Sequence, residues 1–370
     1  MLAILIGGGL ALLISLLGTR VAINVLTHRG FGQEIRDDGP MTHHTKRGTP
    51  TMGGVVIILA TVVGYAASKV ITWDAPSASA LLLLFLFVGT GLVGFLDDYI
   101  KVARQRSLGL RSRAKMIGLT VIAVVFGFLA LSPMLEKNGR TPASHHISFI
   151  RDYEGFALPT VIVIVLIWLI VTGTSNAVNL TDGLDGLATG ASVMVFGAYM
   201  LINIWQNNQF CGDLDTVSSR CYSVRDPLDL AIIAAAITGA CFGFLWWNAS
   251  PARIFMGDTG SLALGGVLAG FAILTRTELL LLVLGGLFVV VTLSVMVQVG
   301  VFKASRASGL FRAMFRVKPG HRVFRIAPLH HHFEMVGWEQ VTVVIRFWII
   351  TGLSVAGGLG VFYAEWVANT

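Results

Sequence analysis

Long apolar stretches recur along the whole chain, and they constrain the fold more than any other feature of the sequence. A helix needs about 20 mostly apolar residues to cross the hydrocarbon core of a bilayer. The sequence therefore predicts an all-α, polytopic membrane protein that forms a single transmembrane domain over residues 1–370. The ten stretches span residues 1–26, 53–71, 79–96, 116–135, 157–173, 187–205, 228–247, 261–275, 279–302 and 341–364.

The low charge content excludes most soluble enzymes. Only 13% of the residues are charged, against roughly 25% in an average globular chain. The first apolar stretch lacks the charged start and the cleavage site of a signal peptide, so we expect it to remain as a helix. Three cysteines are too few for a disulfide scaffold. Cys211 and Cys221 share one polar loop, and the sequence leaves open whether they form a disulfide.

The positions of the basic residues predict the orientation in the membrane. An even number of spans places both termini on one side, and the loops that face the other side contain eighteen of the 27 lysines and arginines. By the positive-inside rule those loops are cytoplasmic and both termini are extracytoplasmic. The net charge of +7 then reflects topology, and we expect no nucleic-acid partner. The cytoplasmic loops are residues 27–52, 97–115, 174–186, 248–260 and 303–340.

Five aspartates lie at the predicted cytoplasmic ends of the spans. Carboxylates beside hydrocarbon are unfavourable and usually indicate a function, although any one of them could instead be a helix cap. Asp182 and Asp185 are three residues apart, so on a helix they would share one face. Oxygen ligands without a thiolate favour Mg²⁺ as the bound cation. The five residues are Asp97, Asp98, Asp182, Asp185 and Asp258.

Three consecutive histidines form a second candidate group, inside the most basic predicted loop. His330, His331 and His332 belong to the segment PLHHHFE. Three adjacent residues of a helix cannot all face one metal ion. They could donate hydrogen bonds to a diphosphate, or they could belong to an ordinary polar loop.

Further polar residues flank these groups, and each has two interpretations. Lys46 could bind a phosphate or merely set the topology. Lys115 could bind a phosphate or reach from its span to the lipid head groups. Asn176, Asn179 and Asn248 offer amide groups that could bind a base or a sugar, and helix capping explains them equally well.

The motifs that contain these residues resemble those of a known family. In this order the chain contains GFGQEIRDDGP, HTKRGTPTMGG, FLDDYIK, NAVNLTDGLDGLA, WWNASPARIFMGDTGSLALGG and IAPLHHHFE. Over essentially its whole length it resembles the polyprenyl-phosphate N-acetylhexosamine-1-phosphate transferases. The PLHHHFE loop indicates the branch of this family that uses UDP-N-acetylmuramoyl-pentapeptide and undecaprenyl phosphate. The resemblance implies a homodimer in the cell membrane of a bacterium that makes lipid I and UMP for peptidoglycan synthesis.

The resemblance also implies roles for individual residues. Asp258 is expected to bind Mg²⁺, Asp97 to act as the base on the lipid phosphate, and Asp98 to assist at the diphosphate or the metal. We expect direct attack of the lipid phosphate on the sugar nucleotide, because one metal and one base suffice for it. The resemblance places the following residues in the substrate cleft: Lys46, Thr51, Lys115, Asn179, Asp182, Asp185, Asn248, Phe255, Ser261, Gln298, His330, His331 and His332.

Three alternatives remain at this stage. For a CDP-alcohol phosphotransferase, Asp182-Gly183 would begin the motif, but Leu184-Asp185-Gly186 lacks the Ala-Arg that should follow. A sister enzyme that transfers N-acetylglucosamine 1-phosphate would share the aspartate motifs but not the PLHHHFE loop. An ion-coupled transporter could also use aspartates within its spans. Its carboxylates would lie near the middle of the membrane, whereas here they lie at the ends of the spans.

Overall fold

A computed structural model describes residues 1–28, 30, 48–104, 109–153, 155–211 and 221–368 of the chain. In this part of the chain the regular elements are helices, and β-bridges occur only in isolation. All ten predicted spans are confirmed as helices that are long and apolar enough to cross a membrane. They are α1 Leu2–His28, α2 Gly54–Thr72, α3 Ala78–Ala103, α4 Ser112–Ala130, α5 Thr160–Thr181, α6 Leu187–Asn208, α7 Pro227–Asn248, α8 Gly257–Leu274, α10 Gly286–Ala307 and α13 Gln340–Ala368.

Helix α8 forms the centre of the bundle. It is the shortest span, and 89% of its 18 residues are buried, against 33% and 22% of apolar segments of the same length in α1 and α10. Small residues allow its close packing, since a Cβ atom at Gly94 of α3 would lie 2.1 Å from the backbone oxygen of Asp258. A Cβ atom at Gly54 of α2 would lie equally close to the backbone of Gly260. The first turn of α8 is therefore held against the C-terminal part of α3 and the start of α2.

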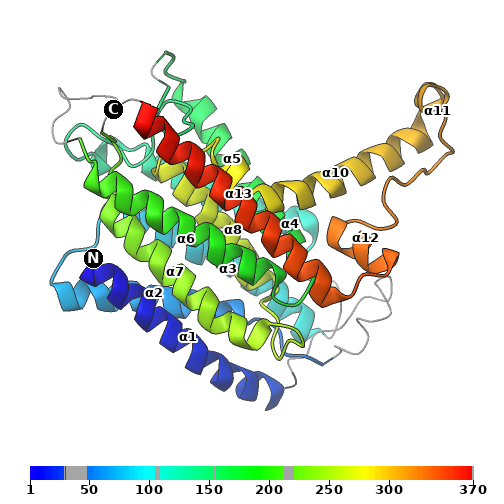
Figure 1. The fold of residues 1–370 in the computed structure, drawn as a ribbon, viewed down its shortest axis with the longest axis horizontal. Coiled ribbons are helices and arrows are strands. Elements are labelled where there is room, and N and C mark those ends of the chain that lie inside the picture. Colours follow the sequence, from blue (N-terminus) through cyan, green and yellow to red (C-terminus); the bar gives the residue numbers. More distant parts are fainter. Residues whose placement is uncertain (29, 31–47, 105–108, 154, 212–220, 369–370) are drawn as a thin grey trace.

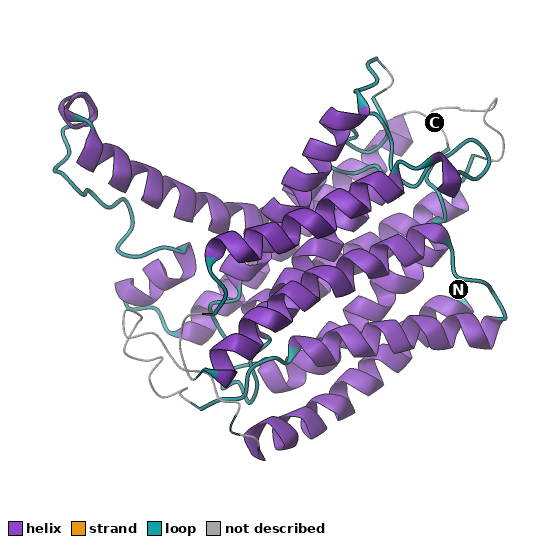
Figure 2. Cartoon of the chain, turned by 180° about the vertical axis from the view of Figure 1, so that it is seen from behind, coloured by secondary structure: helices purple, strands orange, loops and turns teal. Residues whose placement is uncertain are grey.

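Figures 1 and 2 show at which end of the helical bundle the helices begin and end. The first residues of α1 and the last residues of α13 lie at the same end of the bundle. The C-terminal end of α3 and the first turn of α8 lie at the other end, because α1 and α3 run in the same direction and α8 runs against them. This arrangement agrees with an even number of membrane crossings.

The span predicted over residues 279–302 is not one continuous helix. It consists of a short helix, α9 Leu281–Leu284, and of α10, which begins at Gly286. The two consecutive glycines at the junction weaken the helix, and kinks commonly occur at such small residues. Beyond the break, α10 leaves the bundle and projects away from it (Figure 1). The segment predicted as a loop over 303–340 also contains two helices, α11 Gly309–Phe315 and α12 Leu329–Val336.

Other predicted spans have different limits in the structure. The span predicted over 79–96 continues to Ala103, so the first part of the loop predicted over 97–115 is helical. The span predicted to end at residue 135 ends at Ala130, and Pro133–Leu135 form a short 3₁₀ helix after it. The span predicted over 157–173 starts after Pro159 and continues to Thr181. Most of the loop predicted over 174–186 is therefore helical.

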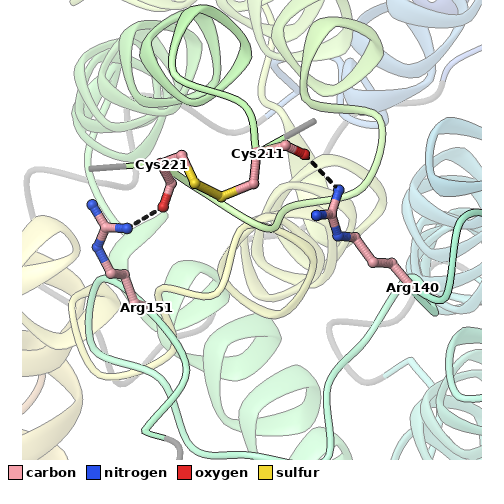
Figure 3. The surroundings of a disulfide bond; sticks show 4 residues. All are labelled: Arg140, Arg151, Cys211 and Cys221. Carbon is pink, nitrogen blue, oxygen red and sulfur yellow. Dashed lines mark hydrogen bonds between the residues drawn. A yellow bond between two sulfur atoms is a disulfide. The ribbon is translucent and has the colours of Figure 1, made fainter. Parts of the chain in front are cut away.

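A disulfide closes the connection between α6 and α7 at the end of the bundle that holds the termini. Cys211 and Cys221 are bonded, with their Cα atoms 5.0 Å apart (Figure 3). Arg140 donates a hydrogen bond of 3.0 Å to the backbone oxygen of Cys211, and Arg151 donates one to that of Cys221. Arg151 also forms an ion pair with Glu365 of α13. The disulfide region thus joins three segments that are distant in the sequence.

Candidate active site

Three aspartates from two helices meet where α8 begins. Asp97 and Asp98 come from the last two turns of α3, and Asp258 comes from the first turn of α8. Each contributes a carboxylate oxygen to a group of atoms that all lie within 4.8 Å of one another. Asp97 and Asp98 are buried, and Asp258 is partly exposed. We call these three residues the acidic cluster.

Asp98 holds the start of α8 in place. Its carboxylate accepts hydrogen bonds from the backbone N–H of Asp258 at 3.2 Å and of Thr259 at 2.9 Å, and from the Thr259 hydroxyl at 2.7 Å. These bonds satisfy N–H groups that a helix leaves without partners in its first turn. Asp98 therefore caps the start of α8, as one of the two interpretations predicted. These contacts also orient the neighbouring Asp258.

The two carboxylate oxygens of Asp97 have different partners. Its Oδ1 atom accepts a hydrogen bond of 2.7 Å from the backbone N–H of Leu110. Its Oδ2 atom is buried and accepts no well-aligned hydrogen bond from the described residues, although the Lys101 ammonium lies 2.6 Å from it. Gly109 is needed beside it, because a Cβ atom there would lie 2.6 Å from Oδ1. Asp97 is thus fixed in position through Oδ1, and its Oδ2 atom forms an ion pair with Lys101.

Two lysines partly neutralise the acidic cluster. The ammonium group of Lys101 lies 2.6 Å from Asp97 Oδ2, 3.5 Å from Asp98 Oδ1 and 2.9 Å from Asp258 Oδ2. Lys115 lies 2.6 Å from the same oxygen of Asp258. Three carboxylates thus face two ammonium groups. The site carries an excess of negative charge that a cation could balance.

Asn179 and Ser261 complete the surroundings of Asp258. The amide group of Asn179 donates hydrogen bonds to Asp258 Oδ1 at 2.7 Å and to the Ser261 hydroxyl at 2.8 Å. Ser261 in turn donates to the backbone oxygen of Gly257 at 3.0 Å. Of the predicted site residues, Asn179 and Lys115 therefore contact Asp258 directly. Ser261 contacts Asn179.

The segments that contain Thr51 and Phe255 run side by side next to the cluster. The backbone N–H of Phe255 donates to the oxygen of Pro50 at 2.8 Å, and that of Gly53 donates to the oxygen of Phe255 at 2.9 Å. Thr51 is buried, and its hydroxyl lies 3.0 Å from the place of a Cβ atom on Gly257. Thr51 therefore lies beside the first turn of α8. Lys46 falls outside the described residues.

Asp182 and Asp185 do not share a helical face, so that expectation was wrong. They lie in the turn between α5 and α6, where Gly186 has a φ of +76°. Burial, together with the nearby carboxylates of Asp258, Asp98 and Asp185, raises the pKa of Asp182 to about 8. Asp185 is buried and accepts a hydrogen bond of 3.1 Å from the backbone N–H of Ala252.

The histidine segment reaches this turn with two of its three rings. A Cβ atom at Gly183 would lie 2.2 Å from Nε2 of His330 and 3.1 Å from Nε2 of His331. His331 also contacts Glu334, with 2.7 Å between Nδ1 and Oε2. His332 lies elsewhere, since its Nδ1 accepts a hydrogen bond from the backbone of Arg325. Gly183 thus allows two histidines to approach the aspartate turn.

Two predicted cleft residues make internal hydrogen bonds instead. The side chain of Asn248 accepts from Thr189 at 2.8 Å and donates to the backbone of Ile254 at 2.9 Å. Gln298 of α10 bonds to the backbone of Val323 and Phe324 at 3.0 Å. Their described contacts thus stabilise neighbouring segments.

Lys101 and Glu334 were not among the predicted site residues. Lys101 was counted only as a topological charge. Its position four residues after Asp97 on one helix would have indicated the contact, because such residues are neighbours on a helix surface. Glu334 follows His331 by three residues and could have been found in the same way.

Comparisons with known proteins agree with this geometry. The profile of glycosyl transferase family 4 matches residues 80–276, and the phospho-N-acetylmuramoyl-pentapeptide-transferase signature 1 matches residues 46–58. These matches include the acidic cluster and the start of α2.

Full-length relatives carry the corresponding name. A phospho-N-acetylmuramoyl-pentapeptide-transferase from Nocardioides sp. is 75% identical to the chain over 373 residues, and the match covers 100% of both proteins. Those of Pseudarthrobacter chlorophenolicus and Cutibacterium acnes are 58% and 56% identical and are covered to 99%. The chain therefore belongs to glycosyl transferase family 4 and, within it, to the phospho-N-acetylmuramoyl-pentapeptide-transferases.

Proposed function

We propose that the chain transfers phospho-N-acetylmuramoyl-pentapeptide from its UDP-activated form to undecaprenyl phosphate, giving lipid I and UMP for peptidoglycan synthesis. The observation that carries this proposal is the acidic cluster with its two lysines, inside a chain that matches such transferases over its full length. Phosphoryl transfer depends mainly on positioning and on charge neutralisation, and this site offers both.

The residues of the acidic cluster fit a magnesium ion. Mg²⁺ prefers carboxylate oxygens and is often bound by one or two carboxylates together with substrate phosphates. Asp258 is the partly exposed member, and the buried Asp97 Oδ2 has no well-aligned hydrogen bond. Asp258 would hold the ion, with Asp97 and Asp98 beside it. When bound, Mg²⁺ would neutralise the charge that develops on the diphosphate.

The side chains of the cluster support direct transfer. Asp97 would accept the proton of the lipid phosphate, whose oxygen attacks the β-phosphorus of the sugar nucleotide. The new P–O bond forms as the bond to the bridging oxygen breaks, and UMP leaves. Lys101 and Lys115 supply fixed positive charges for the diphosphate. Asp98 acts by orienting the start of α8.

The turn between α5 and α6 is the second part of the proposed substrate site. Asp182 is partly exposed there, and His330 and His331 lie against Gly183. We place these polar groups at the sugar nucleotide. His332 is not part of this assignment, because its ring is engaged by Arg325 and Phe324.

The charge distribution supports a cytoplasmic active site. The acidic cluster lies at the end of the bundle opposite the termini, next to the loops that the positive-inside rule assigns to the cytoplasm. The disulfide lies at the other end, as expected for an oxidising compartment. Lipid phosphate at head-group level could reach the cluster while its chain stays in the membrane. The homodimer remains a prediction.

The first experiment measures UMP release by the purified protein. Undecaprenyl phosphate, Mg²⁺ and UDP-N-acetylmuramoyl-pentapeptide are supplied, with UDP-N-acetylglucosamine as the alternative donor. We expect release only with the muramoyl donor, and none from an Asp258→Ala variant. Release with UDP-N-acetylglucosamine instead would indicate the sister transferase. A folded, monodisperse sample that releases UMP from neither donor would contradict the proposal.

A further inference from the structure

A pocket of about 340 Å³ lies between α1 and α7, on a part of the surface that the proposed reaction does not use. It is lined by Arg20, Ile23 and Asn24 of α1, by Trp247 in the last turn of α7, and by Arg253. Arg253 belongs to the segment that connects α7 to α8. The pocket is thus formed where α7 ends and α1 continues past it.

The walls of the pocket are held by close packing of the two helices. A Cβ atom at Gly239 of α7 would lie 2.2 Å from the backbone oxygen of Gly8 of α1. The indole N–H of Trp247 donates a hydrogen bond of 2.8 Å to the backbone oxygen of Leu16. The aromatic wall is therefore fixed to α1 before any ligand binds.

Among the described residues, two arginines and no acidic residue line the pocket. The guanidinium group of Arg253 lies 5.1 Å from the centre of the Trp247 ring, a cation–π contact that leaves its N–H groups available. Within the described ranges, neither Arg20 nor Arg253 forms an ion pair with a carboxylate. Two guanidinium groups beside one cavity favour an anion with several oxygens, and phosphate matches their geometry.

Exposed apolar residues of α1 lie next to the pocket, beside Arg20 and Asn24. Leu17 and Val21 are 65% and 61% exposed. With Arg20 and Asn24 they follow the spacing of a single helical face. One face of α1 thus passes from exposed apolar residues to polar residues at the pocket. Trp and Arg at such a boundary are typical of the interface between hydrocarbon and head groups.

We propose that this pocket binds the phosphate head group of an anionic membrane phospholipid. Arg20 and Arg253 hold the phosphate oxygens, and Asn24 donates a further hydrogen bond. The acyl chains lie along Leu17 and Val21. The ligand is a lipid rather than a free phosphate, because the exposed apolar face continues directly from the basic pocket.

The test measures lipid binding to the full-length protein. Delipidated protein in neutral detergent is titrated with dioleoyl-phosphatidylglycerol, and bound lipid is counted by native mass spectrometry. Dioleoyl-phosphatidylcholine, which has the same chains, is the reference. We expect the Arg20→Gln and Arg253→Gln double variant to bind phosphatidylglycerol about 25-fold more weakly, since each basic side chain near an anionic surface contributes a factor of about five.

Matched variants separate this site from general electrostatics. The control variant Lys303→Gln with Arg316→Gln removes two positive charges outside the pocket. Lys303 lies in α10 and Arg316 directly follows α11. This variant should bind phosphatidylglycerol as the wild type does. Replacement of both pocket arginines by lysine should retain most of the affinity. The melting temperature in neutral detergent reports whether each variant is folded.

Three results would overturn the proposal. The first is equal binding of phosphatidylglycerol by wild type and the glutamine variant, and the second is an equal loss in the α10 control. The third is equal competition by soluble glycerol phosphate, which would indicate a free phosphate ligand. A preference for phosphatidylglycerol that depends on the two arginines supports the proposal.

Discussion

Two groups of aspartate and lysine side chains lie at opposite ends of α2 and α3, and they differ in charge balance. At one end, the acidic cluster sets three carboxylates against Lys101 and Lys115. At the other end, Asp229 faces a single lysine, Lys69, at 2.6 Å. Both partners of that pair are buried. One group therefore carries an excess of negative charge, and the other is neutral.

The two groups also differ in how their oxygens are satisfied. Besides Lys69, Asp229 accepts hydrogen bonds of 2.9 Å from the Tyr65 hydroxyl and from the backbone N–H of Ser77. Both of its oxygens are used, and it links α7 to α2 and to the start of α3. Asp97 Oδ2, in contrast, lies 2.6 Å from Lys101 but accepts no well-aligned hydrogen bond from the described residues. A balanced and satisfied pair indicates a structural role, whereas a group with more carboxylates than ammonium groups indicates chemistry.

The same isosteric change at the two ends should separate these roles. At the acidic cluster, Asp258→Asn removes the charge of the proposed metal ligand and a partner of both lysines. We expect the rate of UMP release to fall by about 10³-fold or more, because such charge stabilisation acts mainly in the transition state. The melting temperature should change by no more than about 2–4 °C. A large loss of stability with normal activity of the remaining folded protein would contradict the assignment.

At the other end, Asp229→Asn should affect stability instead. It leaves the Lys69 ammonium buried without a counter-charge, and breaking such a pair costs about 3–5 kcal/mol. Chemical denaturation in detergent measures this loss, and UMP release per folded molecule should stay near the wild-type value. Combining Lys69→Met with Asp229→Leu should recover most of the lost stability, because it removes both charges. A loss of activity in that double variant at full stability would refute a purely structural role.

The sequence was sufficient to predict the ten spans and the residues of the acidic cluster. Apolar stretches of about 20 residues carry a strong signal, and the order of the motifs indicated the family. The break at Gly285 was not predictable from hydropathy, because both sides of it are equally apolar. The resemblance placed Asn248 and Gln298 in the cleft but did not show that their amides are used within the fold.

Contacts between segments that are distant in the chain were also not predictable from the sequence. Periodicity treated Asp182 and Asp185 as parts of a helix, although the chain turns there, and Gly183 admits two histidines from a segment about 150 residues away. Lys101 was regarded as a topological charge because its three carboxylate partners come from two helices. Such groups form only once the helices pack, so spacing along one helix reveals just part of them.

Like the Lys69–Asp229 pair, the disulfide lies at the end of the bundle that holds the termini, and we expect it to be structural. Cys211 and Cys221 enclose a short loop, for which the loss of the bond costs about 2–3 kcal/mol. We expect reduction to lower the free energy of unfolding by this amount and to leave UMP release unchanged at 25 °C. In a Cys211→Ser and Cys221→Ser variant the reductant should have no further effect. A change in transfer rate on reduction would show that the two ends are coupled.

The smallest expected effect concerns Glu278, between α8 and α9. Its Oε2 atom is buried and has no hydrogen-bond partner in the described part of the chain, and burial raises the pKa of this carboxyl group to about 8. Because the folded state binds this proton more tightly than the unfolded state, the stabilisation is fully present below about pH 4.5. It decreases as the pH rises towards 8. We therefore expect the melting temperature to fall by about 2–4 °C between pH 5 and pH 8.5.

A Glu278→Gln variant tests the origin of this pH dependence. It keeps the shape of the side chain but cannot ionise, so its melting temperature should be nearly constant over the same range and exceed the wild-type value at pH 8.5. Glu339→Gln, which removes an exposed carboxylate beside α13, should retain the wild-type slope. If Glu278→Gln also kept that slope, the titrating group would have to lie elsewhere. The acidic cluster would then be the first place to look, and Asp258→Asn would be measured over the same pH range.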